Sequence, residues 1–434
     1  MKIDCMQKLM NLKKHEFVIN IQKIFTANIL AQLITILISP IITRLFLPSD
    51  FGISSFYASI ISVFGVFVTF GFDQAIILPK KNQEAYDITS LSTISCVLVV
   101  LILIPLCMIP KKILLMIGFD EKAVMFIWII PIAVLLRGIN SILISWCNRE
   151  KKFGAFSISK IVTTSTGAAL KISHGFLFGS NALALIFGRI LGTFSGSVFL
   201  FLKTRNIPVQ IIKNFKLSRL KRALIIYKDF PVYAAPTRFI SSLSQNLPIF
   251  VLGHYFDSSV IGLYAFANNI LRMPIVLLGD SIRKVFLQKA AEYYGKKEIN
   301  KLSELYVKST IGLIVVGLIP FALLFLYGEE LFSFIFGLNW SESGKYAQYL
   351  SVWLFFLFIN PPSRCLYTVF RMQKYLFHYT NITIFIRIIF LLGGAVFFND
   401  PIYSIILYSL SGVFINIYFI VFIYVKIVRM KDKL

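Results

Sequence analysis

Residues 88–109 read ITSLSTISCVLVVLILIPLCMI, a run of 22 positions without a charged side chain. A helix of this length crosses about 30 Å, which is the thickness of the hydrocarbon core of a bilayer. Similar runs recur along the whole 434-residue chain, of which 57% is hydrophobic and only 15% charged. Soluble domains have about 45–50% apolar and about 25% charged residues. The sequence therefore predicts an all-α polytopic membrane protein.

Twelve transmembrane helices are predicted from the apolar runs, with short polar loops between them. Several runs exceed 25 residues, so we expect tilted or broken helices. Prolines inside the runs, among them Pro40, Pro248 and Pro274, predict kinks. The expected ranges are 24–47, 51–78, 87–109, 123–147, 153–177, 180–202, 229–254, 258–287, 304–327, 344–370, 375–398 and 401–425.

The lysine and arginine residues of the loops set the expected orientation, because cytoplasmic loops carry most of them. With a cytoplasmic N-terminus, the inner loops and both termini hold 28 basic residues, whereas the outer loops hold only Lys111, Lys112 and Lys122. The basic N-terminal segment has no small-residue cleavage site near the first apolar run, so no removed signal peptide is expected. We therefore expect an inner-membrane protein with both termini in the cytoplasm.

The longest basic segment divides the predicted spans into two sets of six. The two halves begin alike, since SDFG at 49–52 is followed by Tyr57-Ala58 and SSVIG at 258–262 by Tyr264-Ala265. Six spans per half give both halves the same orientation in the membrane, as in parallel-repeat transporters. We expect two pseudo-symmetric six-helix lobes, residues 1–202 and 229–434, joined by a basic cytoplasmic linker at 203–228.

Thirteen basic residues fall inside or near the predicted spans, where a charge at the bilayer centre costs at least about 2.5–3.5 kcal/mol. Some lie close enough to a span end to reach the interface, and Arg44, Arg137 and Arg189 can also be explained in this way. The others predict a central cationic cavity between the lobes. The expected substrate-binding residues are Arg44, Lys160, Lys171, Arg238, Arg272, Arg364 and Arg387.

Uncharged polar residues accompany these cations on single helix faces. Asn28 and Gln32 belong to a polar stripe on the first span, and Gln245 lies on one side of the seventh span with Arg238. We expect these residues to line the cavity, although such stripes serve equally well for hydrogen bonds between helices. Acidic residues within spans are few, and Asp73 and Asp280 are the candidates for coupling to an ion.

A cavity lined with lysine and arginine predicts an anionic substrate that carries phosphate, diphosphate or carboxylate. The basic residues lie between apolar runs rather than in one patch, so a nucleic-acid partner is not expected. The four histidines are scattered, the five cysteines show no metal-ligand spacing, and there is no phosphate-binding glycine loop. We therefore expect a transporter that is not an enzyme and holds no metal or cofactor.

Several segments in a fixed order carry a resemblance to a known family. They are TRLFLPSDFG at 43–52, GFDQAIILP at 71–79, GLYAFA at 262–267, RMP at 272–274 and FGLNW at 336–340. In these segments the chain resembles the Wzx-type flippases of O-antigen and capsule repeat units. These belong to the multidrug/oligosaccharidyl-lipid/polysaccharide exporter superfamily. No motif of the family assigns a binding role to a particular residue here, so the candidate residues rest on placement alone.

The resemblance implies that the chain moves an undecaprenyl-diphosphate-linked oligosaccharide from the cytoplasmic to the periplasmic leaflet by alternating access. It also implies contact with membrane lipids, coupling to H⁺ or Na⁺, and a polysaccharide polymerase and chain-length proteins as partners. A small-molecule or drug antiporter of the same fold stays open, although it predicts a carboxylate-rich cavity. A peptidoglycan-precursor flippase would have about fourteen spans. A membrane-embedded glycosyltransferase or ligase would need a large periplasmic loop.

Overall fold

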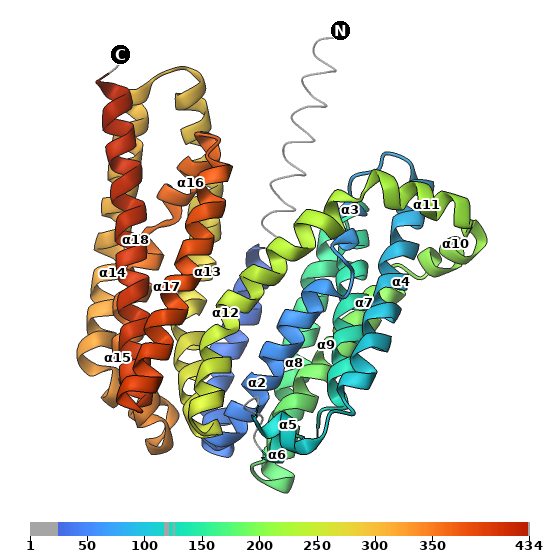
Figure 1. Ribbon diagram of the computed structural model, residues 1–434, viewed down its shortest axis with the longest axis horizontal. Coiled ribbons are helices and arrows are strands. Elements are labelled where there is room, and N and C mark those ends of the chain that lie inside the picture. Colours follow the sequence, from blue (N-terminus) through green and yellow to red (C-terminus); the bar gives the residue numbers. More distant parts are fainter. Residues whose placement is uncertain (1–24, 117–120, 125, 433–434) are drawn as a thin grey trace. The chain divides into compact units, whose positions relative to one another are not determined.

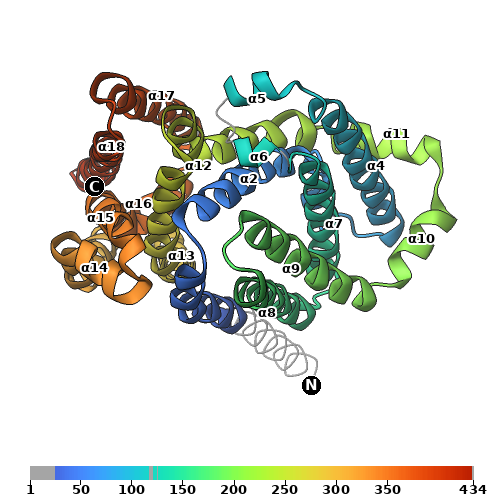
Figure 2. The same ribbon diagram turned by 90° about the horizontal axis from the view of Figure 1, so that it is seen from below.

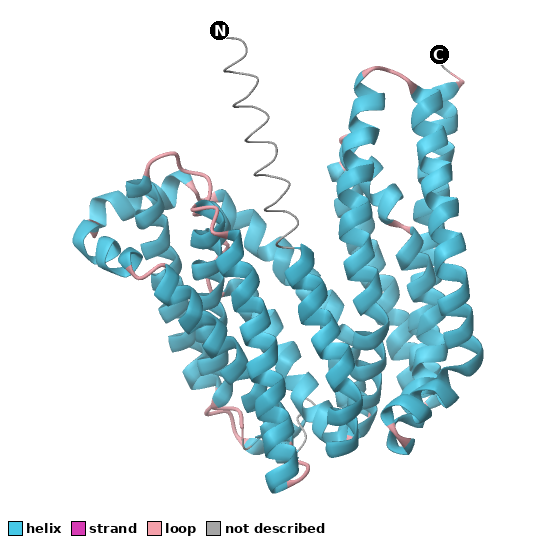
Figure 3. Cartoon of the chain, turned by 180° about the vertical axis from the view of Figure 1, so that it is seen from behind, coloured by secondary structure: helices cyan, strands magenta, loops and turns pink. Residues whose placement is uncertain are grey.

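The computed structural model describes residues 25–116, 121–124 and 126–432. Helices joined by short loops make up this described part, which contains no β-strand (Figure 3). Nine of its helices are long and apolar enough to cross a membrane. The predicted fold class, an all-α multi-pass membrane protein, is therefore confirmed.

Each of the twelve predicted ranges has a helical counterpart among the described residues, but three of these helices are long enough to span a membrane without being apolar enough. These are α8 (Phe153–Phe178), α12 (Ala235–Tyr255) and α15 (Ser341–Ile359). α8 and α12 carry candidate cations, because Lys160 and Lys171 lie in α8 and Arg238 lies in α12. Charged side chains lower the hydropathy of a helix. A helix that carries a functional cation can therefore cross the membrane without meeting the hydropathy of a typical span, and the count of twelve spans stays a prediction.

The chain forms two compact units, each defined by residues that lie close to one another in space. The first unit consists of Met1–Phe46 and Ile53–Asn246, and the second of Leu47–Gly52 and Leu247–Leu434. Both α2 (Pro48–Phe67) and α12 therefore contribute residues to both units. The division into lobes of residues 1–202 and 229–434 stays a prediction. The segment predicted as a linker contains two short helices, α10 (Asn206–Asn214) and α11 (Leu217–Ile226).

The first unit contains the helix Phe25–Leu45, most of α2, and the helices up to the middle of α12. Glycines let α8 and α9 approach closely (Figures 1 and 2), because a Cβ at Gly167 would lie 2.8 Å from the carbonyl oxygen of Gly188. The other helices are α3 (Phe72–Ala75), α4 (Asn82–Leu106), α5 (Lys111–Met116), α6 (Glu121–Val124), α7 (Ile129–Arg149), α9 (Ala182–Lys203), α10 (Asn206–Asn214), α11 (Leu217–Ile226) and the π-helix Phe230–Ala234.

One prediction within the first unit is wrong. The range 51–78 was expected to be one helix, but α2 ends at Phe67 and the short helix α3 begins at Phe72. Phe70 and Gly71 have φ values of 48° and 77°, and two left-handed residues in succession end a right-handed helix. Asp73 therefore lies in α3, directly after the break.

The second unit contains α13 (Ser258–Gly295), α14 (Ile299–Phe336), α16 (Pro361–Val369), α17 (Gln373–Phe398) and α18 (Pro401–Lys431), together with α15. The range 344–370 is interrupted at its two prolines, since α15 ends at Ile359 and α16 begins at Pro361. Proline fits the first turn of a helix because it has no amide hydrogen to leave unpaired there.

Three of the resembling segments meet in the second unit. The ring of Phe51 lies 4.8 Å from that of Trp340 and 5.7 Å from that of Phe266, measured between centroids. Phe266 lies 4.5 Å from Trp340, whose side chain is fully buried. Edge-to-face aromatic pairs at such distances contribute about 0.5–1.5 kcal/mol each beyond their burial. These segments therefore have a packing role.

Candidate functional site

The first unit holds a cavity of about 340 Å³ between α2, α7, α9 and α12, which we call the first-unit cavity. Three arginines from three different helices line it, Arg137 from α7, Arg189 from α9 and Arg238 from α12. The remaining lining residues are Ile61, Gly65, Ala133, Leu136, Asn140, Ser141, Ile144, Ile190 and Thr193. The cavity is thus cationic on several sides and also offers amide and hydroxyl groups.

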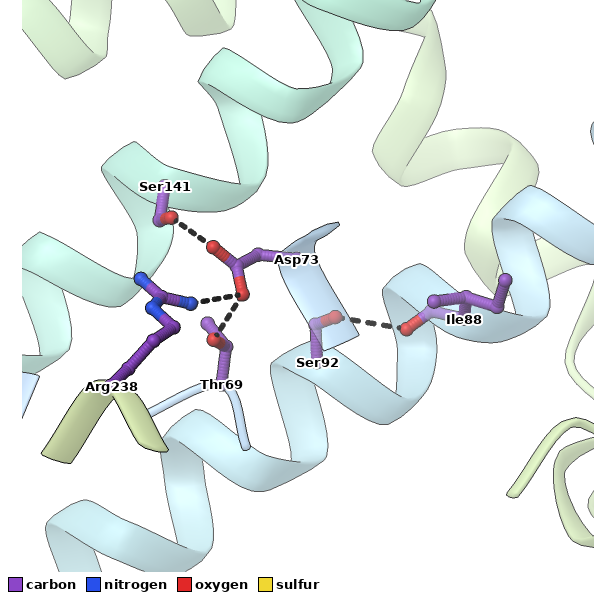
Figure 4. A network of polar contacts seen from close by, with 6 residues as sticks. All are labelled: Thr69, Asp73, Ile88, Ser92, Ser141 and Arg238. Atoms are coloured by element: carbon purple, nitrogen blue, oxygen red, sulfur yellow. Dashed lines mark hydrogen bonds and ion pairs between the residues drawn. The ribbon is translucent and has the colours of Figure 1, made fainter. Parts of the chain in front are cut away.

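Asp73 is the acidic residue that holds one of these arginines in place. Its Oδ1 lies 3.4 Å from Nη1 of Arg238 and accepts a hydrogen bond of 2.7 Å from the Thr69 hydroxyl. The Ser141 hydroxyl donates to Oδ2 at 2.6 Å. Figure 4 shows the three side chains converging on the carboxylate. Asp73 is 4% exposed, whereas the Arg238 side chain is 36% exposed, so the guanidinium keeps a free side.

From the sequence, Arg137 and Arg189 could be explained as side chains that reach the membrane–water interface from the end of a span. The structure places both in the first-unit cavity, where Arg137 repels both Arg189 and Arg238. Gly65 of α2 makes room for Arg137, because a Cβ at position 65 would overlap its side chain. A signal was present in the sequence, since Arg137, Asn140 and Ser141 share one helix face.

The two lysines of α8 have different surroundings. The Lys160 ammonium donates a hydrogen bond of 2.6 Å to the side-chain oxygen of Asn28 on the first helix. The stem of Lys171 lies against Gly188 of α9, and its charge repels that of Arg189. Lys171 thus extends the row of cations that begins in the first-unit cavity, whereas Lys160 is engaged by a polar neighbour.

Three further candidates of the first unit lie outside the cavity lining. Arg44 is exposed near the end of the first helix. Gln245 is exposed and donates to the Ser241 hydroxyl at 3.3 Å. The side-chain oxygen of Gln32 is buried and has no hydrogen-bond partner within the described residues. The structure therefore does not bring these three residues to the arginines.

The second unit has its own group of cations, Arg272 on α13, Arg364 on α16 and Arg387 on α17, which we call the second-unit arginines. The guanidinium carbons of Arg272 and Arg387 lie 5.7 and 5.1 Å from the ring centroid of Trp353. Arg364 repels both of them. A cation over a buried indole gains up to about 2 kcal/mol, which offsets part of the mutual repulsion.

Two buried hydrogen-bond donors near the second-unit arginines have no partner among the described residues. Nε of Arg387 and the indole Nε1 of Trp353 are both buried, and neither has a hydrogen-bond partner within the described part of the chain. An unpaired buried donor costs about 1–3 kcal/mol, more when it is charged. Donors of this kind suit a ligand that accepts hydrogen bonds. Asp280 lies in α13, but its side chain is outside the described residues.

Each unit therefore brings together three arginines from three helices, and one described carboxylate, Asp73, opposes the first group. The described residues contain no group of three histidine, cysteine or acidic side chains that could hold a metal ion. Forked guanidinium donors match the oxygens of phosphate and diphosphate in pairs. The arrangement is thus suited to an anion with several oxygens.

Comparison with known proteins relates the chain to a family of polysaccharide biosynthesis proteins. The sequence pattern of a family described as polysaccharide biosynthesis protein matches residues 41–345. The capsular polysaccharide biosynthesis protein CapF of Staphylococcus aureus is 25% identical over 355 residues, which are 78% of this chain and 82% of that protein.

Two solved structures share the fold at low sequence identity. An inward-facing multidrug resistance transporter of the MATE family and MOP superfamily aligns with a TM-score of 0.73 at 13% identity, over 94% of this chain and 96% of its own. The lipid II flippase MurJ, in an inward closed conformation, aligns with a TM-score of 0.68 at 17% identity, over 94% and 90%. The fold is therefore one that transporters of this superfamily use.

Proposed function

The chain belongs to the polysaccharide biosynthesis protein family, and from this premise we propose that it is a flippase for a lipid-linked oligosaccharide. Its substrate is an undecaprenyl-diphosphate-linked repeat unit of the O-antigen or capsule type. The chain moves it from the cytoplasmic to the periplasmic leaflet of a bacterial inner membrane. The relative of similar length that acts in capsular polysaccharide biosynthesis supports this choice of substrate class.

The observation that carries the proposal is the convergence of Arg137, Arg189 and Arg238 on the first-unit cavity. A diphosphate is the part of the substrate that must leave one aqueous interface and reach the other. In a low-dielectric interior its charge is stable only when cations and hydrogen-bond donors replace water. Three guanidiniums with neighbouring hydroxyl and amide groups supply this replacement, so the chain acts by binding and release and forms no covalent bond with its cargo.

Transport proceeds by alternating access between the two leaflets, with both termini in the cytoplasm, and draws energy from a gradient of H⁺ or Na⁺. Residues 203–228 form the basic cytoplasmic connection between the two lobes, as positive-inside topology requires. The polysaccharide polymerase and chain-length proteins act on the product at the periplasmic face. Each of these points extends the family assignment.

The proposal is tested by removing the chain from its cell. We expect lipid-linked repeat units to accumulate in the inner leaflet and surface polysaccharide to disappear. Re-expression of Arg238→Ala or Arg272→Ala at normal level should restore less than about a tenth of the polymer, since each removes one charge-assisted contact. Lys112→Gln, an exposed cation of α5, is the matched control and should restore all of it. Full restoration by both arginine variants would overturn the role of the cations.

A second candidate is a small-molecule or drug antiporter, which the fold likeness to a multidrug resistance transporter favours. In that case Asp73 would be the residue that responds to a cationic drug or a coupling ion. The cell lacking this chain would then become sensitive to lipophilic cations while its surface polysaccharide remained normal. The two outcomes of the deletion therefore separate the two functions.

A further inference from the structure

An apolar groove of about 540 Å³ lies between α17 and α18 in the second unit, and we call it the α17–α18 groove. The two helices lie side by side (Figures 1 and 2). Its lining is dominated by aromatic and aliphatic side chains, several of which are exposed, such as Ile382 and Phe414. The full lining is Tyr375, His378, Tyr379, Ile382, Thr383, Ile386, Phe390, Ser411, Phe414, Ile415 and Tyr418.

The hydroxyl groups around the groove are already bonded within the protein. The hydroxyls of Tyr375 and Tyr418 lie 2.6 Å from each other. The Tyr379 hydroxyl donates to the carbonyl oxygen of Ile415 at 2.7 Å, and the Ser411 hydroxyl donates to that of Tyr408 at 2.7 Å. These hydroxyl groups already have partners within the protein and the rest of the lining is mainly apolar, so the groove is matched to a hydrocarbon chain rather than to a sugar.

The face of α17 that lines the groove also carries one of the second-unit arginines. Tyr379, Thr383 and Arg387 follow at steps of four along α17 and so share one helix face. The charges of Arg364 and Arg387 act on Tyr379, which lines the groove. The buried Nε of Arg387 has no hydrogen-bond partner in the described chain. The groove-lining face of α17 therefore continues to a cation with an unused donor.

We propose that the α17–α18 groove holds the isoprenoid chain of the lipid-linked substrate in a state in which its diphosphate lies at Arg387 and Arg364 rather than in the first-unit cavity. This inference rests on the proposed function and assigns the lipid half of the substrate to one place in the fold. Charge complementarity distinguishes this ligand from the surrounding lipid, because a diphosphate carries more charge than a phospholipid head group. The isoprenoid chain thus matches the apolar groove, and the diphosphate matches Arg387 and Arg364.

Photo-crosslinking in proteoliposomes tests where the isoprenoid chain of the substrate binds. Benzoylphenylalanine replaces Phe414, which lines the groove, or Phe397, an exposed α17 residue outside the lining, in the full-length protein. Radiolabelled undecaprenyl diphosphate is the probe. We expect capture at position 414 to exceed capture at 397 by about tenfold, which corresponds to about 1.4 kcal/mol. Excess farnesyl diphosphate should compete, whereas phosphatidylglycerol should not.

The head group is tested with Arg387→Gln in the background that carries benzoylphenylalanine at position 414. Capture of undecaprenyl diphosphate should fall about tenfold, while capture of uncharged undecaprenol stays the same. Lys308→Gln, an exposed cation of α14, is the control and should change neither. Equal capture at 414 and 397, competition by phosphatidylglycerol, or indifference to Arg387→Gln would each overturn the inference.

These outcomes are separate from those of the proposed function. If the deletion traps lipid-linked repeat units but crosslinking shows no preference for position 414, the flippase function stands and the groove assignment falls. If the deletion leaves surface polysaccharide unchanged, the function falls whatever the groove binds. Because the comparison of positions 414 and 397 leaves Arg387 intact, it also gives a result if the Arg387 variant does not fold.

Discussion

Asp73 is the residue with the largest difference between its expected and its observed surroundings. The sequence marked it as an intramembrane acid that could bind a coupling ion. In the structure both of its oxygens accept hydrogen bonds, and one of them also pairs with Arg238. A buried carboxyl group with this set of partners holds the guanidinium at a fixed place. We therefore infer that Asp73 positions Arg238.

Asp73→Asn tests this positioning role. The amide keeps the shape of the side chain but loses the charge, so we expect transport of the lipid-linked oligosaccharide to fall about tenfold. If Asp73 acts only through Arg238, the double variant Asp73→Asn/Arg238→Ala should be no slower than Arg238→Ala alone. Initial rates in proteoliposomes at several pH values measure both effects. Additive losses, or a loss of proton dependence in Asp73→Asn alone, would instead support ion coupling.

Arg137 and Arg189 give the second prediction at this scale. Each lines the first-unit cavity beside other cations, so a neutral side chain removes repulsion as well as a donor. We expect Arg137→Gln and Arg189→Gln to fold at least as stably as the parent protein and to transport at about a tenth of its rate or less. Thermal unfolding in detergent and flipping rates in proteoliposomes measure the two properties. A variant that is less stable but transports normally would show that the arginine serves the fold.

At the scale of elements, glycines decide how closely helices approach. Along α9, Gly188, Gly192 and Gly196 recur every four residues, and all three lie against α8. This contact brings Lys171 of α8 next to Arg189 of α9. A small-residue repeat of this kind is visible in the sequence, and it would have predicted the helix pair. It would not have predicted which cations the pair brings together, because that depends on the rotation of each helix.

A second close approach joins the first turn of α2 to α13. A Cβ at Gly52 would overlap the carbonyl oxygen of Ser258, and one at Gly262 would overlap that of Pro48. We expect Gly52→Ala to destabilise the protein by about 1–3 kcal/mol, as overpacking does. Thermal unfolding of the purified protein in detergent should show a lower midpoint temperature.

Gly312→Ala is the control for this prediction. Gly312 lies in α14, and no atom is within 4 Å of the position that its Cβ would occupy. Alanine favours the helix over glycine by about 0.5–1 kcal/mol, so this variant should be unchanged or slightly more stable. The contact between α2 and α13 would be unimportant if both alanine variants unfolded at the same temperature.

At the scale of the whole molecule, the sequence predicted the fold class because apolar length alone decides whether a helix can span a bilayer. It also predicted that Arg238, Arg272, Arg364 and Arg387 lie within helices. It did not predict their grouping into two clusters, because each cluster draws residues from three helices that are distant in the chain. The break at Phe70 and Gly71 was missed for a similar reason, since backbone conformation at two residues leaves no trace in hydropathy.

The orientation of the whole chain gives the last prediction. The positive-inside rule places both termini in the cytoplasm, so the α5 segment should face the periplasm and the turn after α13 the cytoplasm. Cys96, Cys107, Cys147 and Cys365 are buried, and Cys5, which lies outside the described residues, can be replaced by serine. In that background a membrane-impermeant maleimide should label Lys112→Cys in intact cells. It should label Lys296→Cys only after the inner membrane is opened.

Both positions are exposed, so access to the reagent depends on the side of the membrane alone. The opposite pattern would invert the topology, and labelling of both positions in intact cells would mean an even number of spans between them.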